Sequence, residues 1–346
     1  MKIVYAIPFL LLIAGHAACA ATLPGIPGFI DEMVAKHQFK HDELESTFGH
    51  AQYVPAVVTI LSRPATARPW LIYRAAFVNS QRIKFGLEFW HKHRTALQRA
   101  EREYGVPQEI ILAVIGVETI YGQDVGTFRT LDALTTLAFD YPKRADFFRS
   151  ELENFLLLAR EQEFDLLSIH GSFAGAVGMP QFMPSSYRTY AVDFNGNRKI
   201  DLMNEADDAI GSVANYLKGY GWIADGSADL PTSGADTSLP RQTHVQAISP
   251  IALRAQVSEE ICVGDITTPR PIAAWSAAGI VPELNLSPTL AARLIDFTVG
   301  DDKEFWLVFN NFEVITRYNN SDYYAMSVFQ LAEALKDEAR KFNHAK

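Results

Sequence analysis

Glu118 stands at the end of a strongly apolar run, residues 110–117, and is the residue best suited to acid–base chemistry. On a helix it shares one face with Ile111, Val114 and Ile115, so its carboxyl group falls on the buried stripe. Burial disfavours the charged form, and the negative end of the helix dipole acts in the same direction. Both effects raise the pKa of the carboxyl group, as a general acid near neutral pH requires. The alternative is a glutamate at the stripe edge that pairs with an arginine.

A glycine-rich segment at residues 172–187 is a second candidate for chemistry. Gly175 and Gly178 let backbone approach a ligand closely. Gln181 offers a neutral donor and acceptor, which suit an uncharged sugar. The alternative is an ordinary loop followed by the start of a helix.

Residues 318–324 combine three tyrosines with two asparagines. Aromatic rings stack on sugar faces, and amides bind hydroxyl and acetamido groups. A turn with a helix cap at Ser321 or Asp322 is the alternative, and both readings are compatible. Lys143 and Arg144 form a further pair of cations, which would either meet a substrate carboxylate or remain solvated.

Residues 193–205 resemble an EF-hand loop, in which oxygen ligands recur at fixed positions. The candidate ligands are Asp193, Asn195, Asn197, Lys199 through its carbonyl, Asp201 and Glu205. Two departures weaken the match. Arg198 replaces the usual glycine, and Glu205 serves only if the loop is one residue longer. The segment is therefore either a weak site for Ca²⁺ or Na⁺ or a plain turn rich in Asp and Asn.

The expected fold class is mainly α (α+β), a helical body that carries a small antiparallel sheet. Hydrophobic periodicity predicts helices at 28–38, 41–48, 54–61, 83–104, 107–121, 130–139, 144–162, 180–190, 205–219 and 322–342. Pro107 and Gly122 are the expected start and stop signals around Glu118. Two runs favour strands, 292–299 and 305–318, with a hairpin turn at Asn310 and Asn311.

The charge balance and the N-terminus limit where the protein acts. The net charge is −9, with 31 basic and 40 acidic residues and no basic stripe, which excludes nucleic acid as a partner. Lys2, the apolar residues 3–14 and the sequence 18–20 form a signal-peptide pattern with cleavage after Ala20. Cys19 raises the possibility of a lipid anchor, but His16 is a poor lipobox residue. We therefore expect a soluble protein in the periplasm.

Several motifs occur in one order along the chain, at 116–119, 141–145, 172–176, 181–187, 190–194, 209–216, 316–319 and 324–326. Through these motifs the chain resembles the lytic murein transglycosylase B family, glycoside hydrolase family 103, from about residue 28 to the C-terminus. The resemblance implies a lysozyme-like catalytic core. It implies cleavage of the β-1,4 bond between N-acetylmuramic acid and N-acetylglucosamine of peptidoglycan, with 1,6-anhydro-N-acetylmuramic acid ends.

The resemblance also assigns roles by motif position. Glu118 would be the single acid and base, and Lys143 and Arg144 would lie near the peptide stem. The glycan cleft would be lined by Ser172, Gln181, Tyr216, Tyr318, Asn319 and Tyr324. The expected domains are a signal peptide at 1–20, a helical domain at 21–98 joined by the helix 325–346, a catalytic core at 99–225 with 305–324 at its cleft, and a linker with a small β domain at 226–304.

The expected partners are glycan strands and, among proteins, those of cell-wall synthesis, and the expected state is a monomer. No cofactor is required, because a substrate acetamido group and the 6-hydroxyl replace a second carboxylate and water. A hydrolytic muramidase is the rival and needs a second carboxylate, for which Asp124 is nearest in sequence. A non-catalytic peptidoglycan-binding protein is the other rival, and the intact Glu118 argues against it.

Overall fold

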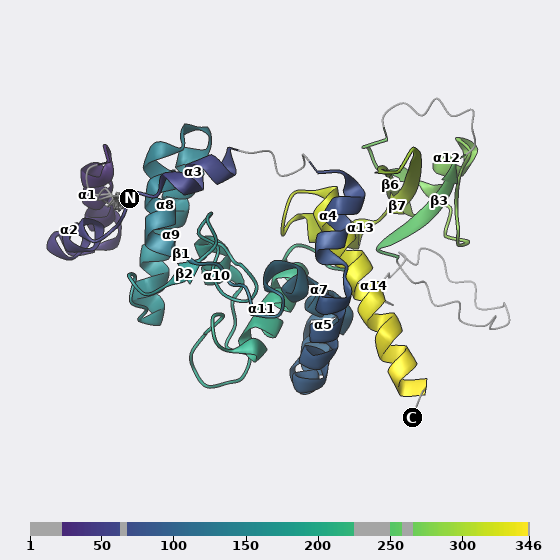
Figure 1. Cartoon of the computed structure of the whole chain (residues 1–346), viewed down its shortest axis with the longest axis horizontal. Helices are drawn as coiled ribbons and strands as arrows, with labels where there is room; N and C mark the ends of the chain where they lie inside the picture. The colour runs from purple at the N-terminus through teal and green to yellow at the C-terminus, as the bar shows by residue number, and fades with distance from the viewer. Residues whose placement is uncertain (1–22, 63–67, 225–249, 258–265, 345–346) are drawn as a thin grey trace, which may run out of the picture.

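The computed structural model describes residues 23–62, 68–224, 250–257 and 266–344. Its helices and strands form three parts along the long axis of the molecule (Figure 1). A helical part at one end includes α1, α2, α8 and α9. The centre holds α5, α7 and α11, and a small sheet lies at the other end. This arrangement confirms the expected mainly helical α+β class.

The first part is built from two segments that are far apart in the sequence. Five helices share one hydrophobic core, in which Phe29, Phe48 and Phe155 are fully buried. They are α1 (Ile26–His37), α2 (His41–Gly49), α3 (Pro55–Leu61), α8 (Thr130–Asp140) and α9 (Ala145–Gln162). A short 3₁₀ turn, η2 (Pro142–Arg144), joins the last two.

The central part surrounds α7 (Gln108–Thr119), in which nine of the 12 residues are buried. A helix that is apolar on every side must be enclosed by others. Its core also includes residues of α4 (Trp70–Phe77), α5 (Ser80–Lys92), α6 (Arg94–Tyr104), α10 (Pro184–Tyr190), α11 (Ala206–Gly219) and α14 (Asp322–His344). A two-stranded ribbon of β1 (Phe128–Arg129) and β2 (His170–Gly171) lies beside them.

The third part is an antiparallel sheet with the strand order β4-β6-β7-β3-β5. Its elements are β3 (Ala252–Val257), β4 (Arg270–Pro271), α12 (Ile272–Ala277), β5 (Ile280–Pro282), β6 (Ala291–Val299) and β7 (Asp302–Val308). Trp275 of α12 is fully buried with Leu294 and Leu307 against the sheet. The chain then enters α13 (Asn310–Thr316) and returns to the centre through α14.

The predicted hairpin at 305–318 is wrong, because its second half is the helix α13. Asn311 does not turn the chain. Instead its side chain accepts a hydrogen bond from the backbone N–H of Ile223 (2.9 Å) and donates one to the Ile223 carbonyl (2.8 Å). The β-branched Val314 and Ile315 are buried in helical conformation, so tertiary packing overrides their strand propensity. The hairpin that does form joins β6 to β7.

Two other expectations about elements need correction. The predicted helix 83–104 is two helices that meet at His93, and α4 follows Pro69 where no helix was predicted. The expected domain boundaries between residues 98 and 99 and between 304 and 305 fall inside α6 and inside β7. The helices α1 to α3 share their core with α8 and α9, whereas α4 and α5, from the same predicted domain, pack against α14.

The predicted signal peptide and Cys19 lie outside the described residues. Within the part of the chain that the structure describes, none of the helices has the length and apolar character needed to cross a bilayer.

Asp208 of α11 holds the loop before this helix through three backbone donors. Its carboxylate accepts hydrogen bonds from Phe194 (2.8 Å), Asn195 (3.3 Å) and Asp201 (2.9 Å), and the residue is fully buried. We expect Asp208→Ala to lower the free energy of unfolding by roughly 2–4 kcal/mol, because buried donors lose their acceptor. Urea denaturation measures this. As a control, Asp207→Ala removes a half-exposed partner of His93 and should lower the free energy of unfolding by less than about 1 kcal/mol. Equal losses in both variants would show that the hydrogen bonds to Asp208 do not stabilise the loop.

Candidate active site around Glu118

The helix α7 ends in an unusual turn directly after Glu118. Ile120 and Tyr121 have φ angles of 52° and 59°, and Gly122 follows with 85°. The left-handed stop thus begins at a β-branched residue, two positions before the glycine that the sequence indicated. Such a conformation is costly for isoleucine and persists only where surrounding contacts enforce it.

Two sets of contacts hold this turn. Thr119 Oγ1 donates to the Met179 carbonyl (2.8 Å) and accepts from the Gly122 N–H (3.0 Å). The buried Tyr121 ring fills the space left by two glycines. A Cβ atom at Gly86 or Gly116 would lie 2.3 or 2.5 Å from the Tyr121 hydroxyl. The end of α7 therefore cannot shift without breaking close packing on both sides.

Among the residues that the structure describes, the Glu118 carboxyl group has one hydrogen-bond partner, the phenol of Tyr324 on α14. The Tyr324 hydroxyl donates to Glu118 Oε1 over 2.5 Å, although 206 positions separate the two residues. Burial raises the pKa of Glu118 from 4.5 to about 7, and the Tyr324 hydrogen bond lowers it by a smaller amount. Residue 118 as a whole is partly exposed. Glu118 therefore has a carboxyl group that can hold or release a proton near neutral pH.

Three predicted site tyrosines form a continuous aromatic group beside Glu118. The rings of Tyr318 and Tyr324 are nearly parallel (15°) with centroids 6.3 Å apart, and Tyr216 lies 4.7 Å from Tyr318. Burial, followed by the charge of Glu118, raises the pKa values of Tyr318 and Tyr324 well above their usual range, so both phenols stay neutral.

The hydroxyl groups of two of these tyrosines bond to the protein backbone. The Tyr318 hydroxyl donates to the carbonyl of Pro180 (2.7 Å), and the Tyr216 hydroxyl donates to the carbonyl of Arg317 (2.7 Å). Tyr216 is almost fully buried. The two side chains thus fix the backbone on either side of the site, and only Tyr324 directs its hydroxyl to Glu118.

Gln181 and Ser172 lie in the glycine-rich segment, which folds back toward the end of α7. Gln181 adopts a φ of 51°, and its amide donates to the carbonyls of Val125 (3.1 Å) and Gly178 (3.0 Å). Both amide hydrogens are thus used within the protein, and among the described residues no hydrogen bond to its Oε1 is present. Ser172 Oγ accepts from the Ala176 N–H (3.1 Å), which leaves its own hydrogen to donate.

Three predicted residues lie further from this centre. Asn319, Lys143 and Arg144 are exposed and make no recorded contact with Glu118. The Arg144 guanidinium lies 4.1 Å from the centre of the Phe147 ring, on the surface of η2 and α9. Asp124, the second carboxylate of the muramidase alternative, is also exposed. Neither Asp124 nor another acidic group contributes to the shifted pKa of Glu118, whose causes are burial and Tyr324.

The loop 193–205 brings most of its predicted ligands together. Asn197 Nδ2 donates to both oxygens of Glu205 (2.9 and 3.0 Å), and Asn195 Nδ2 bonds to the same carboxylate. Arg198 takes a φ of 71°, the conformation for which an EF-hand uses glycine. Asp201 is directed elsewhere, because its Oδ1 accepts from the backbone that leads into α11. In the described residues, no group of three His, Cys, Asp or Glu side chains forms a metal site, so a cation here needs the amide oxygens.

Two residues near Glu118 were not predicted. Tyr73 is close enough for the Glu118 charge to raise its pKa, after burial as the main cause. Arg82 Nε donates to the carbonyl of Gly116 (2.9 Å), two residues before Glu118. Neither belongs to a sequence motif with a chemical signature, and Tyr73 stands on the unpredicted α4, so only the fold reveals them.

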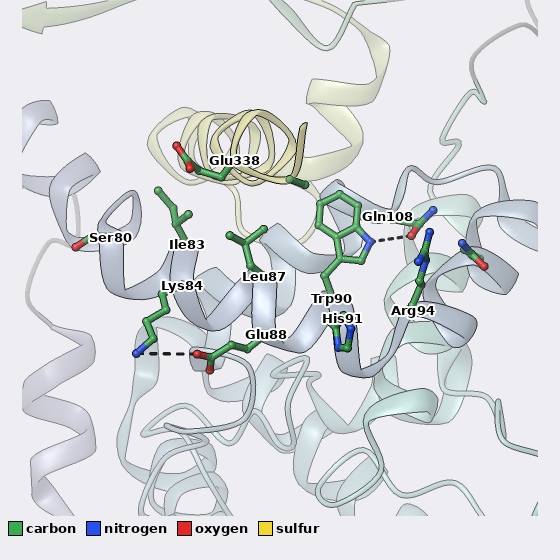
Figure 2. A pocket seen from close by; sticks show the side chains of 12 residues that line it. Ser80, Ile83, Lys84, Leu87, Glu88, Trp90, His91, Arg94, Gln108 and Glu338 are labelled. Atoms are coloured by element: carbon green, nitrogen blue, oxygen red, sulfur yellow. Dashed lines mark hydrogen bonds and ion pairs between the residues drawn. The ribbon is translucent and has the colours of Figure 1, made fainter. Parts of the chain in front are cut away.

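A separate apolar cavity of about 1090 Å³ lies between α5 and α14. Figure 2 shows Ile83, Leu87 and Trp90 of α5 pointing toward α14, with Trp90 Nε1 bonded to Gln108 (2.8 Å). None of the predicted site residues lines it, so its size does not make it the active site.

Comparison with known proteins assigns the family. The chain matches the transglycosylase SLT domain over residues 23–333. It is 39% identical over 325 residues to the membrane-bound lytic murein transglycosylase B of Escherichia coli, covering 91% of this chain and 83% of that protein.

The chain belongs to the transglycosylase SLT family. Two solved structures of lytic transglycosylases have the same fold. Slt35 of Escherichia coli in complex with calcium is 39% identical, with a TM-score of 0.80 over 92% of this chain and 95% of that one. SltB3 of Pseudomonas aeruginosa in complex with NAG-anhNAM-pentapeptide is 27% identical, with a TM-score of 0.74 over 89% of this chain and 78% of that one.

Family membership confirms the lysozyme-like fold and the enzyme class. The protein is a lytic murein transglycosylase, so the alternative of a non-catalytic binding protein is wrong.

The raised pKa of Glu118 makes stability depend on pH. Between pH 4.5 and about 7 the folded protein keeps a proton that the unfolded chain has released, so stability is lost as the pH rises through this range. Glu118→Gln removes this loss. We expect the variant to gain stability relative to the wild type as the pH rises through that range, and the gain should level off at about 3 kcal/mol above pH 7. Chemical denaturation at several pH values measures the difference.

Glu88→Gln is the matched control, since Glu88 is exposed on α5. Its stability relative to the wild type should not change over the same range. A difference between Glu118→Gln and the wild type that is constant with pH would show that Glu118 titrates normally.

Proposed function

We propose that Glu118 is the sole acid and base of a transglycosylase that cleaves the β-1,4 bond between N-acetylmuramic acid and N-acetylglucosamine. The observation that supports this is the carboxyl group itself. It has a pKa of about 7, the residue is partly exposed, and the neutral Tyr324 phenol is its polar partner. One carboxyl group suffices only if the substrate supplies the nucleophile.

The proposed reaction has two stages. Glu118 gives its proton to the glycosidic oxygen as the bond to the anomeric carbon breaks, through an oxocarbenium-like transition state. The acetamido oxygen of the muramoyl residue stabilises that carbon. Glu118, now ionised, takes the proton of the muramoyl 6-hydroxyl, and this oxygen bonds to the anomeric carbon. The anhydro ring closes, no water is consumed, and Glu118 ends protonated.

Tyr324 has a distinct part in this cycle. Its hydroxyl bonds Glu118 Oε1, which leaves the other carboxyl oxygen for proton transfer. A hydrogen bond to a carboxylate favours the charged form, so it supports the second stage. Burial favours the neutral form that starts the first stage. The two opposing effects keep the group close to the pH at which it must work in both directions.

We extend the proposal to the residues around this centre. Gln181 Oε1 would accept from an acetamido N–H, and the Ser172 hydroxyl would donate to a sugar oxygen. Asn319 would add contacts at the exposed side. Lys143 and Arg144 would face the peptide stem, a role that rests on family resemblance. The solved complex of SltB3 with a pentapeptide-bearing ligand supports the view that relatives engage the stem.

The location and domain division are proposals of the same kind. We propose export by the signal segment 1–20, action in the periplasm and a monomeric enzyme without a lipid anchor. The curated relative is named membrane-bound, so the two proteins would differ in this respect. The proposed catalytic unit is the central part around α7, α11 and α14, which carries Glu118 and Tyr324.

The loop 193–205 fits a weak calcium site by its donor chemistry. Asp193, Asn195, Asn197 and Glu205 offer side-chain oxygens, and Lys199 offers a carbonyl. Both Asp193 oxygens already accept backbone N–H groups, and two amides bond to Glu205. An ion would have to replace these bonds, which lowers its affinity. A bound ion would stabilise the loop and take no part in the chemistry.

We expect Glu118→Gln to reduce turnover on purified sacculi at least about 10²-fold, because glutamine cannot donate the proton. Its melting temperature at pH 5, where Glu118 is protonated, should remain close to that of the wild type. Mass spectrometry of wild-type products should show 1,6-anhydro ends. Asp124→Asn is the matched variant and should keep most of the activity. Reducing ends in the product, together with inactivity of Asp124→Asn, would instead establish a hydrolase.

We expect millimolar calcium to raise the melting temperature by a few degrees, because a ligand that binds only the folded state stabilises it. Glu205→Gln should abolish this shift. Asp165→Asn, in a separate turn where Asp165 accepts from the Leu167 N–H, should keep it. The absence of any shift in the wild type up to about 10 mM calcium would leave the loop as a plain turn.

A further inference from the structure

A polar cavity of about 530 Å³ lies at the junction of the sheet with α13 and α14, apart from the residues around Glu118. Its lining includes the charged residues Arg293, Glu313, Arg317 and Asp322, together with Asn320. The cavity therefore offers charges of both signs in one place. The question is which of these charges remain available to a ligand.

Arg293 is occupied by the protein. Its guanidinium bonds Glu313 Oε1 (2.8 Å) and both oxygens of Asp322 (2.7 and 3.0 Å), and its side chain is only 15% exposed. The two carboxylates are more accessible, with side-chain exposures of 40% and 39%. One buried cation thus faces two half-exposed anions, so this side of the cavity carries one surplus negative charge.

Arg317 supplies the opposite charge and is not committed. It is exposed, and within the described residues neither its guanidinium nor the Asn320 amide has a hydrogen-bond or ion-pair partner. A guanidinium with free donors is the preferred partner of a carboxylate. The amide of Asn320 adds a neutral donor and acceptor.

The cavity shares its wall with the active site. Residues 317–321 connect α13 to α14, and this connection places Arg317 on the cavity. The Arg317 carbonyl accepts from Tyr216, and the next residue, Tyr318, lies against Tyr324. A ligand in the cavity would therefore contact the same short connection that positions the tyrosines beside Glu118.

We propose that this cavity binds a peptide group that carries both a free amine and a free carboxylate. The carboxylate would bind Arg317, and the ammonium would bind the surplus charge on Glu313 and Asp322. A neutral sugar has no charged group that could pair with these residues, whereas the peptide stem of the glycan can carry both an ammonium group and a carboxylate. The proposal adds a stem-recognition site, apart from Lys143 and Arg144, and rests on the proposed function for its substrate. A free peptide has the same chemistry and is the other source.

The first test is direct binding. The probe is alanyl-alanine, compared with its N-acetylated and its C-amidated forms, and binding is followed by calorimetry and by NMR. We expect the free dipeptide to bind and each cap to weaken it roughly tenfold, since each removes a charge-assisted hydrogen bond. Arg317→Gln should weaken the free dipeptide to the level of the C-amidated one. Equal binding of all three probes, or unchanged binding by Arg317→Gln, would overturn the proposal.

Arg254→Gln is the matched control, because Arg254 is a half-exposed arginine on the sheet that pairs with Glu304 outside this cavity. It should bind the dipeptide as the wild type does. A loss of binding equal to that of Arg317→Gln would mean that overall charge, rather than this cavity, attracts the peptide.

The second test separates the two sources of the peptide. The ratio of kcat/KM for peptide-bearing glycan strands to that for strands stripped by an amidase is measured for the wild type and Arg317→Gln. A ratio that falls several-fold in the variant identifies the stem of the substrate as the ligand. An unchanged ratio with dipeptide binding retained in the wild type identifies a free peptide. Cleavage of stripped strands that depends on Glu118 tests the proposed function independently of either result.

Discussion

The structure depends on keeping one carboxyl group largely away from water at the end of an apolar helix. Burial holds the proton on Glu118, and one phenol opposes it. The contacts around Glu118 set its pKa through these two opposing effects, burial and the hydrogen bond from Tyr324. If polar groups surrounded the Glu118 carboxyl group, it would be ionised at neutral pH. If the residue were fully enclosed in the core, a substrate could not contact it. Glu118 instead lies beside aromatic rings and is partly exposed as a residue.

The surroundings of Glu118 are formed by segments that are far apart in the sequence. Helix α7 supplies the carboxyl group, the glycine-rich segment fixes the turn that follows it through Met179, and α14 supplies the phenol. The small sheet also affects the position of Tyr324, because β7 is followed in the chain by α13 and then by the connection to α14. The position of Tyr324 is thus tied to the packing of all three segments on α7.

Most polar groups around Glu118 are committed to the protein rather than left for a ligand. The hydroxyls of Tyr216 and Tyr318 and the amide donors of Gln181 all bond to backbone carbonyls. Such bonds hold side chains in place before a substrate arrives, so little ordering is required on binding. Among the described residues, Gln181 Oε1 and the guanidinium of Arg317 have no hydrogen-bond partner, so these groups are the best candidates for contact with a ligand.

The sequence by itself determined the helical class, the apolar helix that carries Glu118, the motifs around it and the family they resemble, because these follow from local periodicity and residue order. It did not determine which tyrosine hydroxyls bond to the backbone, that Ile120 starts the left-handed turn, or that residues 310–316 are helical. Those outcomes depend on partners far away in the chain, such as Gly86 for Tyr121 and Ile223 for Asn311. The raised pKa of Glu118 was foreseen in direction from the apolar run. Its value near neutrality was decided by tertiary structure, because the depth of burial and the bond to Tyr324 exist only in the folded chain.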